Sequence, residues 1–375
     1  MPNKRPRARD LGIGFQGEPG PWNAITDVPG VEVGYQTLIS GDGPLIVGQG
    51  PVRTGVTVVL PLGRGQLGRS CPAGWHSLNG NGEMTGTAWL DEAGSLALPI
   101  GITNTHAVGP VHRGIIDWAV KADPALGDRW HLPVVAETWD GYLNDINGSH
   151  VTAGTAMLAL DAAASGPVAE GSVGGGTGMN CYGFKGGTGT ASRRVRIGSL
   201  SYTVASLMQA NFGSRHELVV AGRRLGEQLA DDNPLESGWL APPGAGSCIT
   251  IVATDAPLLP GQCKALARRV PLGLARTGTT GSHYSGDLFV AFSAANIGVL
   301  DSWIDSPGES AGAAAGGLPV IEFVPWGLLD PLYEAVVQCV EESVLNALVA
   351  AATMIGRDGH RSPGFPVEQI PGLLA

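Results

Sequence analysis

The chain has 375 residues, of which 43% are hydrophobic and only 15% charged, and its formal net charge is −10. This length allows a large core in one to three domains, and the 58 glycines and 27 prolines indicate many turns in a globular chain rather than disorder. The only basic cluster, residues 4–9, is expected to be a solvated, frayed terminus, so the composition argues against a nucleic-acid partner.

The cysteines and the apolar runs indicate where in the cell the protein is expected and whether it is expected to bind a metal. The five cysteines are far apart and contain no C-x-x-C pair, which predicts neither a disulfide framework nor a zinc site. The histidines are scattered, and we expect no metal and no other cofactor. No apolar run reaches the length of a membrane span, and no apolar stretch follows the charged N-terminus as it would in a signal peptide. We therefore expect a cytoplasmic protein without a membrane partner.

The first third of the chain is predicted to contain mainly strands and loops. Residues 1–20 are expected to form an irregular arm, and residues 62–80 a loop. Strands are predicted where apolar or β-branched runs occur: 23–34, broken at Pro29-Gly30, then 53–61 and 99–105. Helices are expected at about 110–122 and 151–164, where alanine, leucine and methionine are frequent.

A further predicted strand, beginning at Pro133, carries an unusual carboxylate. Glu137 follows four apolar or small residues and precedes a polar and aromatic segment that includes Trp139 and Tyr142. A buried carboxylate needs a partner. From the local sequence alone, that partner is either a structural arginine or the amine of a ligand.

The glycine-rich stretch 171–192 invites comparison with phosphate-binding loops, which the detail does not support. Met179 stands where the third glycine of a dinucleotide fingerprint belongs, and no glycine is followed by Lys-Ser/Thr at P-loop spacing. The stretch also leads into strands predicted at about 195–210, not into the helix N-terminus that would hold a phosphate. We expect closely packed backbone lining a pocket instead.

The second half of the chain alternates predicted strands with polar loops. A strand over 204–213 ends near Asn211, a long loop covers 231–246, and Ser247 lies where this loop meets a buried strand at 248–254. The remaining predictions are a helix at 260–275, a polar loop at 277–287, a strand at 288–293, a loop at 306–317, and a helix from about Pro331 to Ile355 stopped by Gly356. Without regular βαβ alternation, the pattern indicates α+β layers in one compact unit.

Ser247 suggests a hydrolytic chemistry, although its surroundings match no common motif. The chain has no H-E-x-x-H zinc motif, and no glycine stands two residues after Ser247 as in G-x-S-x-G. If the Gly246–Ser247 bond is cut, however, Ser247 gains an α-amino group with a pKa of about 7.7–8.0. That amine can accept the hydroxyl proton without a histidine.

These residues resemble a known family, the self-processing serine aminopeptidases of the L-aminopeptidase/D-esterase and β-peptidyl aminopeptidase type, which share a fold with ornithine acetyltransferases. The resemblance covers nearly the whole chain, from Gly20 to the strand at 287–293. The segments that carry it are 53–57, 79–83, 103–105, 137–138, 174–189, 211–213, 246–247 and 253–255.

The resemblance implies a four-layer αββα sandwich in a single domain, residues 1–375. It also implies self-cleavage between Gly246 and Ser247 into an α chain, 1–246, and a β chain, 247–375. These chains stay associated and assemble as a homotetramer of αβ units. The implied substrates are short peptides and amino-acid amides or esters.

The same resemblance implies roles for individual residues, each at a position that matches the family motif. Ser247 would be the nucleophile with its own amine as base, Asn211 the oxyanion donor, and Ser285 with Asp287 the pair that orients the new N-terminus. Asp287 departs from β-peptidyl members, which carry a glutamate there. Glu137 matches the carboxylate that binds the substrate amine, and Trp139 and Tyr142 either line the side-chain pocket or pack in the core.

Two alternatives remain at this stage. One is an acyltransferase of the ornithine type, although that class usually begins its β chain with threonine rather than serine. The other is an unprocessed, non-catalytic binding protein that keeps the glycine-lined pocket. The sequence does not choose among L-, D- and β-residues as substrates.

Overall fold

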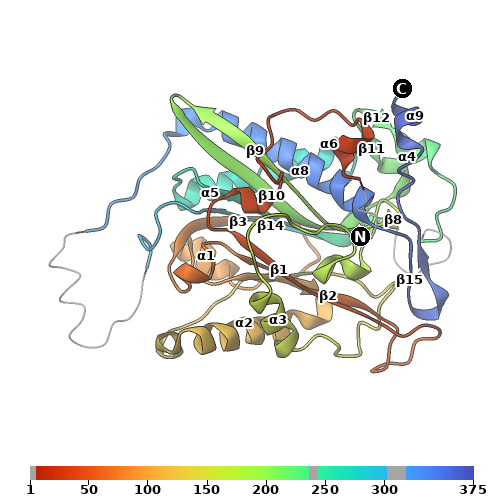
Figure 1. Ribbon diagram of the computed structural model, residues 1–375, viewed down its shortest axis with the longest axis horizontal. Coiled ribbons are helices and arrows are strands. Elements are labelled where there is room, and N and C mark those ends of the chain that lie inside the picture. Colours follow the sequence, from red (N-terminus) through yellow and green to blue (C-terminus); the bar gives the residue numbers. More distant parts are fainter. Residues whose placement is uncertain (1–5, 236–243, 302–317) are drawn as a thin grey trace.

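The computed structural model describes residues 6–235, 244–301 and 318–375, which form a mixed α and β structure around two main sheets (Figure 1). The first sheet has the order β1-β2-β5-β6, comprising β1 Glu32–Ser40, β2 Val52–Leu60, β5 Ile100–Asn104 and β6 Val135–Thr138. The second has the order β4-β3-β14-β13-β10-β9, comprising β3 Cys71–Gly80, β4 Ser95–Leu96, β9 Gly187–Ile197, β10 Leu200–Gly213, β13 Gly244–Thr254 and β14 Ser285–Ser293.

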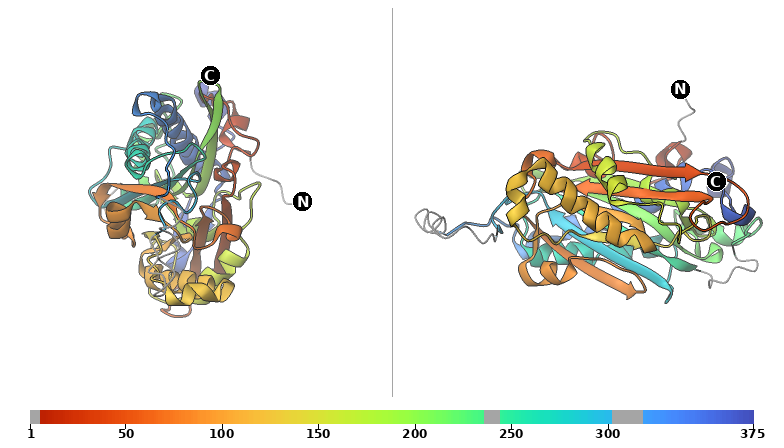
Figure 2. Two further views of the ribbon diagram at one scale, coloured as in Figure 1. Left: turned by 90° about the vertical axis from the view of Figure 1, so that its left-hand side faces the viewer. Right: turned by 90° about the horizontal axis from the view of Figure 1, so that it is seen from below.

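The helices pack against the two sheets from opposite sides. Helices α2, Val108–Ala122, and α3, Ala153–Asp161, lie on the first sheet (Figure 2). Helices α5, Pro260–Ala267, α6, Val270–Arg276, and α8, Asp330–Ala350, lie on the side of the second. The shorter elements are α1 Thr87–Ala93, α4 Leu225–Gln228, α9 Ile370–Leu374, β7 Asn180–Cys181, β8 Phe184–Lys185, β11 Val219–Val220, β12 Arg223–Arg224, β15 Met354–Ile355 and β16 Arg361–Ser362. None of the helices in the described ranges is long and apolar enough to cross a membrane.

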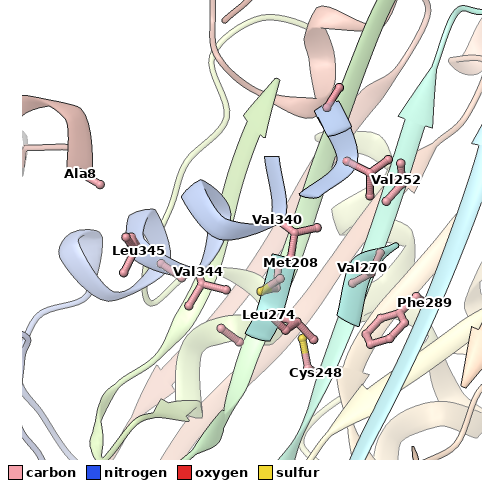
Figure 3. Close-up of a cluster of buried hydrophobic side chains, with 14 of the residues drawn as sticks. Ala8, Met208, Cys248, Val252, Val270, Leu274, Phe289, Val340, Val344 and Leu345 are labelled. Carbon is pink, nitrogen blue, oxygen red and sulfur yellow. The ribbon is translucent and has the colours of Figure 1, made fainter. Parts of the chain in front are cut away.

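Three buried clusters hold these parts together. One lies between the sheets, where Val59 and Ile102 of the first sheet share a cluster with Leu207, Ile251 and Val290 of the second. A second fills the space between the first sheet and helices α2 and α3. The third lies between the second sheet and its helices, where Met208, Cys248, Leu274, Val340 and Val344 gather (Figure 3). Burial of apolar surface in these three places is the main favourable contribution to folding.

Strand β13 shows how the sequence sets the direction of the site residues. Its side chains alternate between faces, as the period of a strand requires. Ile249 and Ile251 belong to the cluster between the sheets, whereas Cys248 and Val252 belong to the cluster under the helices. Ser247, two residues before Ile249, therefore lies on the face that looks toward the first sheet.

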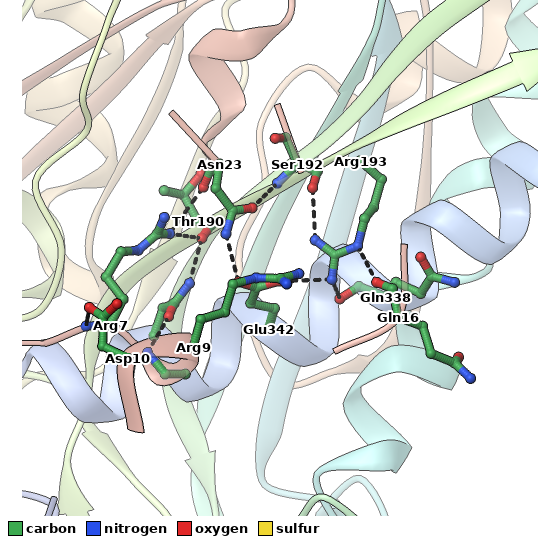
Figure 4. A network of polar contacts seen from close by, with 12 residues as sticks. Arg7, Arg9, Asp10, Gln16, Asn23, Thr190, Ser192, Arg193, Gln338 and Glu342 are labelled. Atoms are coloured by element: carbon green, nitrogen blue, oxygen red, sulfur yellow. Dashed lines mark hydrogen bonds and ion pairs between the residues drawn. The ribbon is translucent and has the colours of Figure 1, made fainter. Parts of the chain in front are cut away.

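The N-terminal arm is anchored, which corrects the prediction of a solvated, frayed terminus for the residues described from 6 onward. Arg9 forms an ion pair at 2.7 Å with Glu342 of α8, and Arg193 of β9 forms another with the same carboxylate at 2.7 Å (Figure 4). Asn23 donates a third contact to Glu342 at 2.6 Å, and Arg7 pairs with Glu170. Glu342 is fully buried, so its negative charge needs positively charged partners. Arg9 of the arm and Arg193 of β9 supply them, and the arm is thereby joined to β9 and α8.

Several element predictions are confirmed and others are wrong. The strands at 53–61, 99–105 and 288–293 and the helices at 110–122 and 151–164 are present with small shifts in their ends. Residues 62–80 are not all loop, because Cys71–Gly80 form β3. The first half of 23–34 contains a 3-10 helix, Ile25–Asp27, and only the second half is a strand. The predicted loop 306–317 lies outside the described residues.

The remaining differences occur around β13 and at helix ends. The predicted loop 231–246 is partly outside the described residues, and its last part, from Gly244, is already strand. The helix at 260–275 is two helices, because Pro271 cannot donate to the preceding turn and marks the start of α6. Helix α8 stops at Ala350, since Met354–Ile355 pair with Arg361–Ser362 instead of extending the helix.

Candidate active site

Ser247 is held inside the second sheet by neighbours on both sides. It lies opposite Asn211 of β10 in an antiparallel pair and beside Gly286 of β14 in a parallel pair, and its side chain is buried. The Oγ hydroxyl donates to the carbonyl oxygen of Gly246 at 2.7 Å. A Cβ at position 246 would lie 1.8 Å from the carbonyl oxygen of Asn211, so only glycine fits there. The Ser247 hydroxyl thus contacts the carbonyl group of the peptide bond that precedes Ser247.

Asn211 brings its carboxamide close to Gly246. Its Oδ1 accepts from the backbone N–H of Asn180 at 2.7 Å, and its Nδ2 donates to the carbonyl of Trp139 at 2.9 Å. The position that a Cβ would take at Gly246 is 3.1 Å from Nδ2. An amide nitrogen has two protons, and one of them is sufficient for the contact with Trp139.

Ser285 and Asp287 lie together on β14, beside β13. The Ser285 hydroxyl donates to Asp287 Oδ1 at 2.6 Å, and Ser285 pairs in register with Gly246. Asp287 pairs in register with Cys248, the residue after Ser247. The two side chains therefore flank the backbone of the Gly246–Ser247 junction.

Burial sets the charge state of Asp287. Removal from water raises the pKa of this carboxyl to about 6, although the Ser285 hydroxyl and the Cys248 amide oppose the shift. A carboxyl group with this pKa is largely ionised at neutral pH, but it changes charge within the range of ordinary assays. Perturbed groups of this kind gather at functional sites.

Glu137 is buried at the end of β6, as the sequence predicted. Its Oε1 accepts from the backbone N–H of Glu83 at 2.9 Å, and its Oε2 accepts from the Thr105 hydroxyl. Burial raises the pKa of Glu137, and these two hydrogen bonds oppose the shift. The described residues provide no arginine or lysine partner for this carboxylate, which removes the structural arginine considered from the sequence.

Two glycines connect Glu137 with the strand next to Ser247. A Cβ at Gly82 would lie 3.2 Å from Glu137 Oε1 and 2.9 Å from Gly286 Cα. A Cβ at Gly286 would in turn lie 2.5 Å from Gly82 Cα. Because neither residue has a side chain, the backbones approach closely between the carboxylate and the neighbour of Ser247.

Trp139 and Tyr142 take different positions. Trp139 reaches the site through its carbonyl, which accepts from Asn211, and its side chain is partly buried. The Tyr142 ring is buried and stacks on His360, with ring centroids 4.7 Å apart. The structure thus links Trp139 directly to Asn211 and packs Tyr142 against the C-terminal part of the chain.

Three residues were not assigned from the sequence. Asn79 of β3 donates to Asp287 Oδ2 at 3.1 Å, Thr105 donates to Glu137, and Lys185 lies fully buried within the glycine-rich stretch. Each falls in a segment that carried the family resemblance. A lone polar residue within such a segment was the sequence feature that could have indicated a role in the site. No group of three or more histidine, cysteine, aspartate or glutamate side chains in the described parts of the chain is arranged to hold a metal ion.

Known proteins resemble the chain over nearly its whole length. The pattern of peptidase family S58 matches residues 23–362. The β-peptidyl aminopeptidase BapA of Sphingosinicella microcystinivorans is 50% identical, covering 98% of this chain and 92% of the relative. BapA of Sphingosinicella xenopeptidilytica is 44% identical over 98% of this chain and 91% of its own.

A solved structure agrees with these relatives. The L-aminopeptidase D-Ala-esterase/amidase of Ochrobactrum anthropi, described as a prototype of the serine aminopeptidases and a variant of the Ntn-hydrolase fold, superposes with a TM-score of 0.89 at 44% identity, covering 99% of this chain and 98% of that one. The buried serine of β13, the buried carboxylate of Glu137 and this similarity lead to one conclusion. The chain belongs to peptidase family S58.

Proposed function

We propose that this protein is a serine aminopeptidase that cuts its own chain between Gly246 and Ser247 and then uses Ser247 as the nucleophile. The observation that carries the proposal is the placement of the Ser247 hydroxyl, 2.7 Å from the carbonyl oxygen of Gly246. The carboxamide of Asn211 lies beside this bond, and the buried carboxylate of Glu137 lies across two glycines from it.

This placement supports self-cleavage. Ser247 Oγ attacks the carbonyl carbon of Gly246, the C–N bond breaks, and the acyl group moves to the oxygen as an ester while the nitrogen becomes a free amine. Water then hydrolyses the ester, leaving a carboxylate on Gly246 and the hydroxyl on Ser247. Asn211 donates to the oxyanion of each tetrahedral intermediate.

Peptide hydrolysis repeats the same chemistry on a substrate. The free amine of Ser247 takes the hydroxyl proton as Oγ attacks the substrate carbonyl, and the leaving amine departs with a proton. Ser285 and Asp287 flank the new N-terminus and orient its amine. Water then releases the acyl group from Ser247, which restores the enzyme.

Glu137 accounts for the choice of an N-terminal residue. A substrate ammonium in contact with this carboxylate makes a charge-assisted hydrogen bond and places a cation directly against the buried group. Trp139 and Tyr142 are proposed to contribute to the side-chain pocket. Trp139 has the stronger support, since its carbonyl contacts Asn211 directly.

The proposed substrates are short peptides, amides or esters that begin with a β-residue or with an L- or D-amino acid. The names of the relatives support these classes: two are β-peptidyl aminopeptidases and one is an L-aminopeptidase D-Ala-esterase/amidase. Membership in a peptidase family favours hydrolysis over the ornithine-type acyltransferase and over a non-catalytic binding protein.

The proposal extends to the assembly. Two sheets packed face to face, with helices on the outer sides, support a four-layer αββα sandwich in one domain. The α and β chains are proposed to stay associated and to form a homotetramer in the cytoplasm. Exposed apolar side chains around a cavity of about 620 Å³, among them Trp130 at 84% exposure, support burial between subunits.

A substrate panel with one variant tests the proposed activity. The wild-type protein is incubated with p-nitroanilides of L-, D- and β-residues, alongside Ser247→Ala and the control Ser201→Ala, which changes an exposed serine of β10. We expect release of nitroaniline by the wild type and the control, and none by Ser247→Ala. Hydrolysis retained by Ser247→Ala would overturn the mechanism.

A further inference from the structure

The carboxamide of Asn211 is fixed in one orientation by two backbone groups. The N–H of Asn180 can only meet the amide oxygen, and the carbonyl of Trp139 can only meet the amide nitrogen. A flipped amide would place donor against donor and acceptor against acceptor. Whatever holds the Asn180 peptide unit therefore also holds the nitrogen that faces the Gly246–Ser247 bond.

Lys185 holds that peptide unit from its other end. Its Nζ is fully buried and donates to the carbonyls of Met179 at 2.8 Å, Gly186 at 2.9 Å and Gly176 at 3.4 Å. The Met179 carbonyl and the Asn180 N–H belong to the same planar peptide group, in which they point in opposite directions. One peptide group thus joins the ammonium of Lys185 to the amide oxygen of Asn211.

These contacts form a continuous series of hydrogen bonds. It runs from Lys185 Nζ to the Met179 carbonyl, from the Asn180 N–H to Asn211 Oδ1, and ends at Asn211 Nδ2. Hydrogen bonds in series polarise one another, and a cation at one end strengthens the donor at the other. The series therefore both orients Asn211 Nδ2 and makes it a better donor to an oxyanion.

Asp140 acts electrostatically on Lys185. It is fully buried, it follows Trp139 directly, and its Cβ is only 2.8 Å from the position that a Cβ would take at Gly178. Burial lowers the pKa of Lys185 to about 7 and raises that of Asp140 to about 7, and the ionised form of Asp140 opposes the shift of Lys185. Asp140 thus favours the charged form of the lysine while standing next to the carbonyl that holds Asn211.

We propose that Lys185 is a positioning residue of the proposed reaction, acting through the Met179–Asn180 peptide to orient and polarise the Asn211 carboxamide. The proposal rests on the proposed role of Asn211 as the oxyanion donor. It assigns a reason for the burial of a lysine within the glycine-rich stretch 171–192. It also predicts that Lys185 serves self-cleavage and peptide hydrolysis alike, since both pass through an oxyanion at the same place.

The first test is Lys185→Met, which keeps the length of the side chain and removes the ammonium. Loss of an oxyanion donor itself costs about 10²–10³-fold in kcat, so loss of its support should cost roughly 10–100-fold. KM should change less than about twofold, because Glu137 and its partners are untouched. Lys121→Met, which removes an exposed lysine from α2, is the matched control and should match the wild type.

The deciding test combines this variant with Asn211→Ala. If Lys185 acts through Asn211, the double variant should be no slower than Asn211→Ala alone, within about twofold. A purely structural lysine would slow the enzyme by the same factor in both backgrounds, and that result would overturn the proposal. Rates are given per cleaved subunit, and the time course of self-cleavage is measured in parallel so that slowly maturing variants also yield a rate.

Two further outcomes separate this proposal from the proposed function. Asn211→Ala with wild-type rates would overturn the role of Asn211 and this proposal together. A slow Asn211→Ala with an unimpaired Lys185→Met would overturn this proposal alone. If Lys185→Met does not accumulate as folded protein, Lys185→Gln decides, because it keeps two N–H donors without the charge and is expected to lower kcat in the same direction.

Discussion

At the scale of the residue, Glu137 combines a buried charge with a specific requirement for a cation. Its two oxygens accept from a backbone N–H and a hydroxyl, neither of which neutralises the charge. Burial raises the pKa of this carboxyl, so its ionised form gains most from an ammonium supplied by the substrate. We propose that specificity for a free N-terminus arises from this electrostatic need.

Replacement of Glu137 by glutamine tests this specificity. The amide keeps the shape and loses the charge, and loss of a charge-assisted hydrogen bond of about 1.5–3 kcal/mol predicts a KM higher by roughly 10–150-fold. The kinetic constants are measured with free and N-acetylated versions of one substrate. Glu92→Gln, which changes an exposed glutamate of α1, is the control. A variant that still discriminates fully between the two substrates would show that Glu137 does not bind the amine.

Asp287 predicts a stability that depends on pH. Its pKa is about 6 in the folded chain and 3.8 in the reference state, so the folded form binds the proton more tightly. The stability associated with the protonated group is present below pH 3.8 and is lost as the pH rises through 6. Replacing Asp287 by asparagine in an uncut Ser247→Ala chain should therefore stabilise the fold above pH 6, by at most about 3 kcal/mol.

Urea unfolding at several pH values checks this prediction. The gain of Asp287→Asn should be largest above pH 7 and should disappear near pH 4. A gain that does not vary with pH would mean that the carboxylate is not strained by burial. In the self-cleaving chain the same substitution should slow hydrolysis, which is a common exchange of stability for function.

The site residues predicted from the sequence rest on two different kinds of signal. Ser247, Asn211, Ser285 and Asp287 come from three different strands, and the family resemblance named them although no local pattern brings them together. Local pattern indicated the burial of Glu137, because the carboxylate follows an apolar run. Lys185 was not assigned because its partners are backbone carbonyls. Asn79 was not assigned because its partner, Asp287, is distant in the chain. Neither kind of contact leaves a periodic signal in the sequence.

At the scale of the element, the ion-pair cluster around Glu342 fastens the N-terminal arm to α8. Burial alone would raise the pKa of Glu342, but Arg9, Arg193 and Asn23 outweigh it and lower the pKa. The stabilisation is therefore present at neutral pH and is lost as the pH falls through the acidic range. Replacing Glu342 by alanine leaves two arginines without their partner.

We expect Glu342→Ala to lower the free energy of unfolding by about 3–5 kcal/mol at neutral pH, the usual cost of breaking a buried pair from one side. Glu341→Ala is the matched control, because the neighbouring glutamate makes only a surface pair with Arg276 and should cost at most about 1 kcal/mol. Both are measured by denaturant unfolding of the uncut Ser247→Ala chain. Equal effects of the two substitutions would contradict the proposal that Glu342 fastens the N-terminal arm to α8.

Elements with strong periodicity were predicted well, and elements set by tertiary contacts were not. Strand β2 and helix α2 follow directly from apolar patterning. Strand β3 contains glycine, proline and asparagine, which are typical of a loop. It forms a strand because it pairs with β14. It also lets α5 approach Gly74, where a Cβ would lie 2.5 Å from the backbone nitrogen of Lys264. Such packing overrides local propensity and is invisible in a single sequence.

At the scale of the whole molecule, the second sheet is built from both sides of the proposed cut. Strand β13, Gly244–Thr254, contains the proposed cut, and β14 follows it. Both strands lie between β3 and β10, which precede the cut. Helix α8, also after the cut, packs on β9 and β10. A break at residue 246 therefore leaves every central strand paired, and the two chains should elute together on native size exclusion and separate only in denaturant.

The measurement that tests the central claim most directly is the intact mass of the purified protein after denaturation. We predict two masses, corresponding to residues 1–246 and 247–375, with Ser247 as the first residue of the smaller chain, and a single full-length mass for Ser247→Ala. A single full-length mass from a preparation that hydrolyses substrate at its full rate, or a cut elsewhere in the chain, would contradict the account.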